Sequence, residues 1–107
     1  MQDYIVEGFV HVDNSLLSLK HICNRISQLC QSISRDDVDW LINFGEGNAI
    51  LRPGDNKLLF RISTQDILIF YGIQTIIEGS LSDLPKILTD GIEWIPGTEI
   101  PFATTGV

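Results

Sequence analysis

A chain of 107 residues, 44% of them hydrophobic and 20% charged, has the length and composition of one globular domain rather than of a disordered segment. Its 14 acidic and 7 basic residues give a net charge of −7, and the basic residues are dispersed, which excludes the clustered positive surface that DNA and RNA binding requires. The first residues lack the pattern of a secretory signal, and the longest uncharged run, Ile67–Ile77, is shorter than the ~18 apolar residues of a membrane span, so we expect one cytoplasmic domain over residues 1–107 with no membrane anchor.

The N-terminal part of the sequence predicts a strand followed by a helix. From Tyr4 to Val12 apolar residues alternate with others, as they do in a half-buried strand. Residues 13–15 offer polar side chains for an N-cap, and apolar residues then recur at steps of three and four as far as Ile33. This spacing predicts an amphipathic helix of about five turns.

Two cysteines, Cys23 and Cys30, lie on the apolar stripe of this predicted helix. At a rise of about 1.5 Å per residue their Cα atoms would be about 10.5 Å apart, which is beyond the reach of a disulfide. We therefore expect two reduced thiols with a packing role, which agrees with a cytoplasmic location.

The middle of the chain predicts an antiparallel meander. Alternation over residues 38–44 indicates a strand with aromatic side chains on its inner face, and the glycines of residues 45–47 then turn the chain. A short strand over 49–51 and an alternating strand over 57–62 flank a second turn at residues 53–56. Glycine and proline serve the bends of this stretch, so its purpose is interpreted as structural.

The C-terminal third predicts two more helices and a last strand. A sequence similar to a capping box precedes residues 67–77, which are apolar on nearly all sides. A helix ending near Gly79 is favoured there, with a strand as the alternative. Residues 82–88 predict a short helix and residues 92–95 a short strand, and the chain is expected to be irregular from about residue 96.

Taken in order, these elements predict an α+β fold with the sequence β-α-β-β-β-α-α-β. The expected architecture is an antiparallel sheet of about four to five strands, with the two main helices packed on one face. Both helical stripes and the inner faces of the strands then share one core.

No combination of residues has the spacing of a catalytic or metal site. Residues 45–47 lack the third glycine and the following Lys-Ser/Thr of a phosphate-binding loop. His21 and Cys23 point about 200° apart around a helix, so they cannot share one tetrahedral metal site. Glu7 and His11 lie on one face of the first strand and could exchange a proton, although an ion pair is the commoner outcome. We expect no enzyme activity, no metal and no cofactor.

The acidic residues are interpreted as a binding surface. They gather where the second strand begins and at the two meander turns, with Asp55 at the second turn, and two more acids flank Trp94. The three acids at the junction between the loop and the second strand, Asp36, Asp37 and Asp39, are expected to stay solvated and ionised. Aromatic side chains surrounded by carboxylates suit the recognition of a basic protein, whereas the alternative is that Trp94 belongs to the core and the acids only face water. The candidate partner-binding residues are Asp36, Asp37, Asp39, Glu46, Glu93, Trp94 and Glu99.

A group of short bacterial proteins of unknown function resembles the chain over two stretches, VEGFVHVDNSLLSLKHIC and INFGEGNAILRPGDNKLLFRISTQDILIFYGIQTIIEGSL. Those proteins pair an early strand and helix with a meander and a closing helix. In size, acidity and lack of catalytic groups the chain is also similar to bacterial immunity proteins, including those of contact-dependent growth inhibition systems. This second resemblance implies that the chain neutralises a nuclease toxin in the cytosol by covering a basic active-site cleft with an acidic surface.

The leading hypothesis is a non-enzymatic protein that binds and inhibits a basic protein partner. A second hypothesis is a small-molecule or substrate-handling domain with a pocket between sheet and helices, in which His11 and Glu7 are the polar anchors. A third is a homo-oligomer whose interface hides the all-round apolar helix near Phe70.

Overall fold

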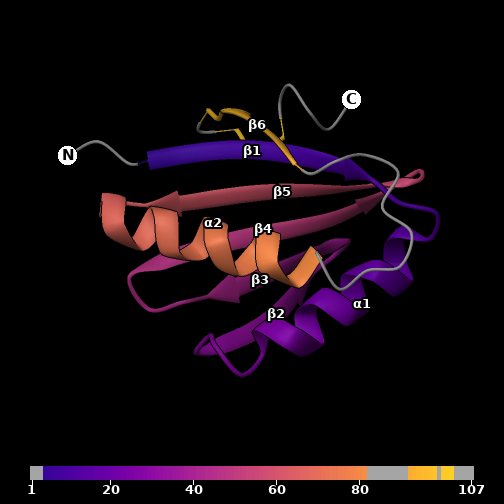
Figure 1. Ribbon diagram of the computed structural model, residues 1–107, viewed down its shortest axis with the longest axis horizontal. Coiled ribbons are helices and arrows are strands. Elements are labelled where there is room, and N and C mark those ends of the chain that lie inside the picture. The colour runs from indigo at the N-terminus through magenta and orange to yellow at the C-terminus, as the bar shows by residue number, and fades with distance from the viewer. Residues whose placement is uncertain (1–3, 82–91, 99, 103–107) are drawn as a thin grey trace.

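The computed structural model describes residues 4–81, 92–98 and 100–102, and Figure 1 shows their arrangement. Within these residues the chain forms six strands and two helices. In chain order they are β1 (Tyr4–His11), α1 (Ser15–Ile26), β2 (Ser32–Asp36), β3 (Asp39–Asn43), β4 (Gly47–Gly54), β5 (Lys57–Thr64), α2 (Ile67–Leu81) and β6 (Glu93–Pro96).

The strands form one antiparallel sheet in the order β2-β3-β4-β5-β1-β6. The meander from β2 to β5 is continued by β1, which pairs with β5 on one side and with β6 on the other. The predicted α+β class and the antiparallel sheet are therefore confirmed. The described residues contribute six strands, somewhat more than expected, because β2 was not predicted.

Both helices lie on one face of the sheet, as predicted, and pack mainly over β4 and β5 (Figure 1). The alternation of each strand points one set of side chains at the helices and the other set at the opposite face, which we call the open face. α2 comes close to β4 at Gly47, where a Cβ atom would lie 2.7 Å from Ile73 Cδ1. The most deeply buried side chains between sheet and helices include Phe60, Leu19, Ile22, Ile26, Ile42 and Leu51.

The predicted five-turn helix is wrong in roughly its last third, because α1 ends at Ile26 and the chain turns through residues 27–31 into β2. Ile33 pairs with Ile42 in the β2–β3 ladder and packs against the core that a helical Ile33 would also have reached. Leu29, another position of the predicted stripe, is 61% exposed. Apolar residues continue at steps of three and four past Ile26 by coincidence. The chain forms β2 there because it pairs with β3.

The start of α1 agrees with the sequence. Asn14 is the N-cap residue, and its Oδ1 accepts a hydrogen bond of 3.0 Å from the N–H of Leu17. This bond pairs one of the N–H groups that the first turn of a helix leaves without an internal partner. The polar residues 13–15 were therefore a correct signal of a helix start.

α2 is a helix, so the alternative of a strand is excluded, and it runs past Gly79 to Leu81. Ile77 on its inner side is fully buried. On its outer side Leu68 is 76% exposed and Tyr71 is 59% exposed. The all-round apolar composition of the helix therefore leaves large apolar side chains exposed on the side that faces away from the core.

The remaining C-terminal predictions are only partly covered by the described residues. The short helix expected over residues 82–88 lies outside them. The strand expected over 92–95 is β6, at Glu93–Pro96, and the described residues that follow it, 97–98 and 100–102, form neither helix nor strand. None of the described helices is long and apolar enough to cross a membrane.

Candidate protein-binding surface

Three loops lie together at one end of the sheet. Successive turns of a meander alternate between its two ends, so the β2–β3 turn and the β4–β5 turn share an end. Val12, which follows β1, donates its N–H to the carbonyl of Asn56 at 3.0 Å, so the β1–α1 loop lies beside the β4–β5 turn. We call this surface the hairpin end, and its exposed carboxylates are Asp13, Asp36, Asp37 and Asp55.

Two residues of the left-handed region form the tight turns of the hairpin end. Asp37 has a φ of 58° in the β2–β3 turn, and Asn56 has a φ of 56° in the β4–β5 turn. Asp and Asn adopt this conformation more readily than other residues with a Cβ atom, because their short polar side chains bond to the local backbone. Asp37 therefore serves the turn as well as the surface charge.

The carboxylates at the tips of the two hairpins carry net negative charge to the solvent. Among the described residues, Asp36, Asp37 and Asp55 form no ion pair. The nearest arginines are engaged, since Arg52 binds a different carboxylate and Arg35 lies over an aromatic ring. The hairpin end therefore presents an acidic surface on a backbone that the sheet holds in place.

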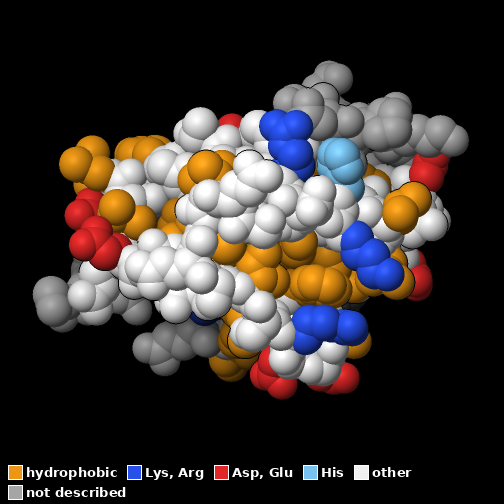
Figure 2. Space-filling view, turned by 90° about the horizontal axis from the view of Figure 1, so that it is seen from below, with side chains coloured by type: hydrophobic (Ala, Val, Ile, Leu, Met, Phe, Trp, Pro, Cys, Tyr) orange, Lys and Arg blue, Asp and Glu red, His pale blue; other side chains and the backbone are white. Residues whose placement is uncertain are grey.

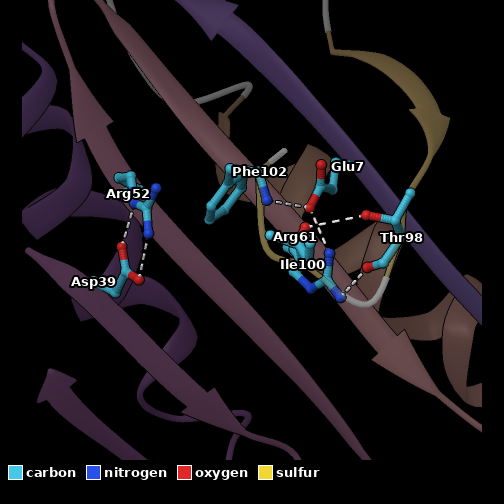
Figure 3. A network of polar contacts seen from close by, with 7 residues as sticks. All are labelled: Glu7, Asp39, Arg52, Arg61, Thr98, Ile100 and Phe102. Atoms are coloured by element: carbon cyan, nitrogen blue, oxygen red, sulfur yellow. Dashed lines mark hydrogen bonds and ion pairs between the residues drawn. The ribbon is translucent and has the colours of Figure 1, made fainter. Parts of the chain in front are cut away.

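Asp39, which the sequence suggested would stay solvated, is instead tied to the neighbouring strand (Figure 3). Arg52 Nε donates to Asp39 Oδ1 at 2.6 Å, and Arg52 Nη2 donates to Oδ2 at 2.8 Å. This two-point hydrogen bond raises the pKa of Arg52. The Asp39 side chain is only 17% exposed. Its charge is compensated, so Asp39 joins β3 to β4 rather than adding to the acidic surface.

Glu46 lies at the opposite end of the sheet from the predicted aspartate cluster. It is exposed in the β3–β4 connection, beside Gly45 with its φ of 92°, and its carbonyl accepts a hydrogen bond of 2.8 Å from Thr64 Oγ1. The five residues of β3, at about 3.4 Å each, separate this turn from the β2–β3 turn by roughly 17 Å. The prediction that Glu46 clusters with the aspartates is therefore wrong.

Trp94 packs on the core side of the sheet. It pairs with Gly8 in the β1–β6 ladder, and its ring centroid lies 6.2 Å from that of Phe60. Its Nε1 donates to Glu78 Oε1 on α2 at 2.8 Å. Trp94 therefore belongs to the core, which is the alternative that the sequence left open, rather than to a surface of aromatic side chains surrounded by carboxylates.

The two acids beside Trp94 in the sequence do not extend the hairpin end. The backbone of Glu93 pairs with Phe9 in β6, which is the edge strand opposite β2. Strands lie about 4.8 Å apart, so β6 and β2 are separated by more than about 20 Å across the sheet. Glu99 lies outside the described residues.

A buried ion pair on the open face was not expected from the sequence. Glu7 and Arg61 are register partners on β1 and β5, and they are 2% and 6% exposed. Arg61 Nη1 donates to Glu7 Oε2 at 2.5 Å (Figure 3). Arg61 Nη2 also donates to the carbonyl of Thr98, and the N–H of Phe102 donates to Glu7 Oε2 at 2.6 Å. Backbone groups that follow β6 therefore complete the pairing of both buried charges.

The residues that supply these groups, 97–98 and 100–102, are called the C-terminal strap. At its start, the N–H of Gly97 donates to the carbonyl of Ile5 at 2.9 Å, and a Cβ atom on Gly97 would lie 2.6 Å from Ile5 Cγ2. At its other end, Phe102 is 3% exposed with a φ of 57°, and Arg52 Cζ lies 4.7 Å from the centroid of its ring. The strap thus covers part of the open face.

The predicted pocket between sheet and helices does not have its expected polar anchors. Glu7 and His11 share a strand face, as predicted, but this is the open face, because the alternate residues Val10 and Val12 fill the core. Glu7 is held by Arg61, and the exposed His11 ring meets the ring of Phe9 edge-on with centroids 5.4 Å apart. The assignment of Glu7 and His11 to such a pocket is therefore wrong.

Both cysteines are free thiols, as predicted, but only Cys23 lies on α1, because the helix ends at Ile26 and Cys30 follows in the connection to β2. Cys23 is buried, Cys30 is partly buried, and both are free thiols, whereas His21 is exposed on α1. Burial, together with the nearby Cys30, raises the pKa of Cys23 to about 11. Within the described part of the chain, no three His, Cys, Asp or Glu side chains are placed to hold a metal ion.

An arginine and a tryptophan stack beside the acidic tip of the β2–β3 hairpin. Arg35 and Trp40 are register partners, and Arg35 Cζ lies 4.9 Å from the centroid of the Trp40 ring. Trp40 Nε1 is buried and has no acceptor among the described residues. Sequence reasoning assigned no role to this pair, because the contact depends on β2, which was not predicted.

Comparison with known proteins identifies the fold and no family. No protein-family model and no curated protein matches the chain. The NMR structure of PA4090 from Pseudomonas aeruginosa is similar over 87% of this chain and 96% of that chain, with a TM-score of 0.65 and 14% sequence identity. This likeness supports the α+β arrangement of the sheet and its helices.

Proposed function

We propose that this chain is a non-enzymatic binding protein that neutralises a basic protein partner, with the hairpin end as its contact surface. The observation that carries the proposal is the group formed by Asp36, Asp37 and Asp55, which are exposed and form no ion pair among the described residues. They lie on tight turns of one continuous sheet, so little conformational entropy is lost when a partner binds them.

The whole-chain charge favours the same kind of partner. A net charge of −7 attracts a positive protein over distances comparable with the Debye length, which is about 10 Å at moderate salt. Such attraction raises the association rate and orients the two molecules before they touch. Asp39 and Glu46 take no part, because Asp39 is compensated by Arg52 and Glu46 lies at the other end of the sheet.

The finer proposal is an immunity protein that acts in the cytoplasm and blocks a nuclease toxin. A nuclease holds phosphate groups in a positive cleft, which is the surface that a preformed acidic hairpin end complements. The acidity, the small size and the resemblance to immunity proteins support this class.

The test uses a toxin domain encoded next to this chain in its genome. The two proteins are mixed, and nuclease activity and association rate are measured at low and at high salt. We expect inhibition, and we expect Asp36→Lys combined with Asp55→Lys to slow association at low salt by roughly tenfold or more, with the difference narrowing as salt rises.

Glu46→Lys provides the matched control, because it makes the same change of charge at an exposed position at the opposite end. Glu46→Lys should slow association at low salt clearly less than either Asp36→Lys or Asp55→Lys does. Equal effects at the two ends would reject the hairpin end as the contact surface, and a toxin domain that is neither bound nor inhibited would reject the proposed partner class.

A further inference from the structure

The β2–β3 hairpin carries an aromatic ring that a cation of the same chain covers. Arg35 and Trp40 face each other across the ladder on the side of the sheet that the helices occupy, with 4.9 Å between Arg35 Cζ and the ring centroid. Trp40 is partly buried, whereas Arg35 is exposed. The Trp40 ring is therefore covered by the long, solvent-facing side chain of Arg35 and not by a helix or strand packed against it.

The position of the ring in the sheet explains this cover. The helices pack mainly over β4 and β5, and Trp40 lies on β3, next to the edge strand β2. Figure 2 looks at the molecule from below the view of Figure 1, which is the side of β2, and shows hydrophobic side chains gathered in the middle of that face with Lys and Arg side chains at their border. Apolar surface near this edge is therefore bordered by cations.

We infer that Arg35 occupies the place over Trp40 that an arginine or lysine of the basic partner takes in the complex. This inference rests on the proposed function and assigns its anchoring contact. The face of a tryptophan ring attracts cations, and an exposed pair of this kind is weak enough to exchange. Asp37 lies two residues beyond Arg35, in the turn at the tip of the same hairpin.

The indole N–H supports this exchange. Trp40 Nε1 is buried and has no acceptor among the described residues, whereas a buried N–H is normally hydrogen-bonded. Movement of Arg35 opens the face of the ring to the partner, and a partner group that reaches the edge of the ring can accept from the N–H. Tryptophan and arginine are also the residues that most often dominate the energy of protein interfaces.

The test uses nona-arginine as the probe and the ¹⁵N-labelled full chain at low salt. The two tryptophans give two indole N–H signals, which Trp94→Phe assigns. We expect the Trp40 signal to shift in a saturable manner while the Trp94 signal stays, because Trp94 Nε1 is bonded to Glu78. We also expect Arg35→Ala to raise the affinity for the peptide, since it removes the competing cation.

Lys20→Ala is the matched control, because it removes one positive charge from an exposed position on α1. The increase in affinity for the peptide should be about two- to fivefold larger for Arg35→Ala than for Lys20→Ala. Trp40→Leu should weaken binding of the peptide at unchanged charge. Should that variant disturb the hairpin, Arg35→Ala still tests the inference, because Arg35 is exposed and its removal leaves the fold intact.

The outcomes separate the two proposals. The ring site is overturned if the Trp40 signal does not move and the two alanine variants gain equally in affinity for the peptide. If the amide signals of Asp36 and Asp37 shift in the same experiment, the hairpin end is still supported as the contact surface. Unmoved amide signals throughout the hairpin end count against the proposed contact surface as well.

Discussion

Arg61 donates to Glu7 across the β1–β5 ladder with an Nη1–Oε2 distance of 2.5 Å, and both side chains are almost fully buried. The carbonyl of Thr98 and the N–H of Phe102 supply further hydrogen bonds to the pair. A buried charge that loses its partner is far more costly than a buried pair, so the two residues depend on each other.

Replacing Glu7 by leucine should therefore strongly destabilise the protein. We expect Glu7→Leu to lower the free energy of unfolding by about 3–5 kcal/mol, because the Arg61 guanidinium stays buried without its carboxylate. Adding Arg61→Leu should recover much of this loss. Urea unfolding measures all three proteins, and a double variant that is no more stable than the single one would show that the pairing is not the cause.

Gly97 should resist substitution because the strap crosses β1 closely. A Cβ atom there would lie 2.6 Å from Ile5 Cγ2 and 3.2 Å from Glu7 Cγ, and Gly97→Ala should cost about 1–3 kcal/mol through overpacking. Gly72→Ala is the control, because a Cβ atom on Gly72 meets nothing within 4 Å. Within α2 that change should stabilise the protein by about 0.5–1 kcal/mol, so the thermal midpoints should move in opposite directions.

The aromatic end of the strap should contribute to stability through its burial. Phe102 is 3% exposed and lies under the Arg52 guanidinium, so Phe102→Ala should lower the free energy of unfolding by about 3 kcal/mol. Ile100 lies in the same strap but is 69% exposed, and Ile100→Ala should cost less than about 0.5 kcal/mol. Similar losses in the two variants, measured by chemical unfolding, would contradict the packed position of the Phe102 ring.

The buried thiol predicts a loss of stability in alkali. Because the pKa of Cys23 rises from 9.0 to about 11 on folding, the native state keeps a proton that the unfolded state releases. The stabilising contribution is complete below pH 9 and is lost as the pH rises toward 11. Between these values the stability of the wild type should fall by roughly 1–3 kcal/mol more than that of Cys23→Ala, and parallel curves for the two proteins would refute the assignment.

Local patterns in the sequence predicted most of the fold. The alternation of β1 and of the central strands, the N-cap at Asn14 and the dense apolar run of α2 are local signals, and each produced the expected element. β2 was missed because Ser32–Asp36 contains a single apolar residue, Ile33, whose spacing also suits a helix. Its pairing with β3 is a property of the folded sheet and has no local signal.

The candidate site was predictable only in part, for the same reason. Acids at tight turns can be read from the sequence, and Asp36 and Asp37 are exposed there. Which turns share an end depends on the full strand order, and the bond of Asp39 to Arg52 depends on the position of β3 against β4. The Glu7–Arg61 pair joins residues 54 positions apart, and only the β1–β5 register brings them together.

The hydrogen bond between Phe102 and Glu7 spans 95 positions of the chain, and it sets an order on biosynthesis. β1 is made before β5, β6 and the strap, which together enclose the carboxylate of Glu7. Contacts of such long range also slow folding, because the chain must close a large loop before they form. The open face is therefore completed only after the strap has been translated.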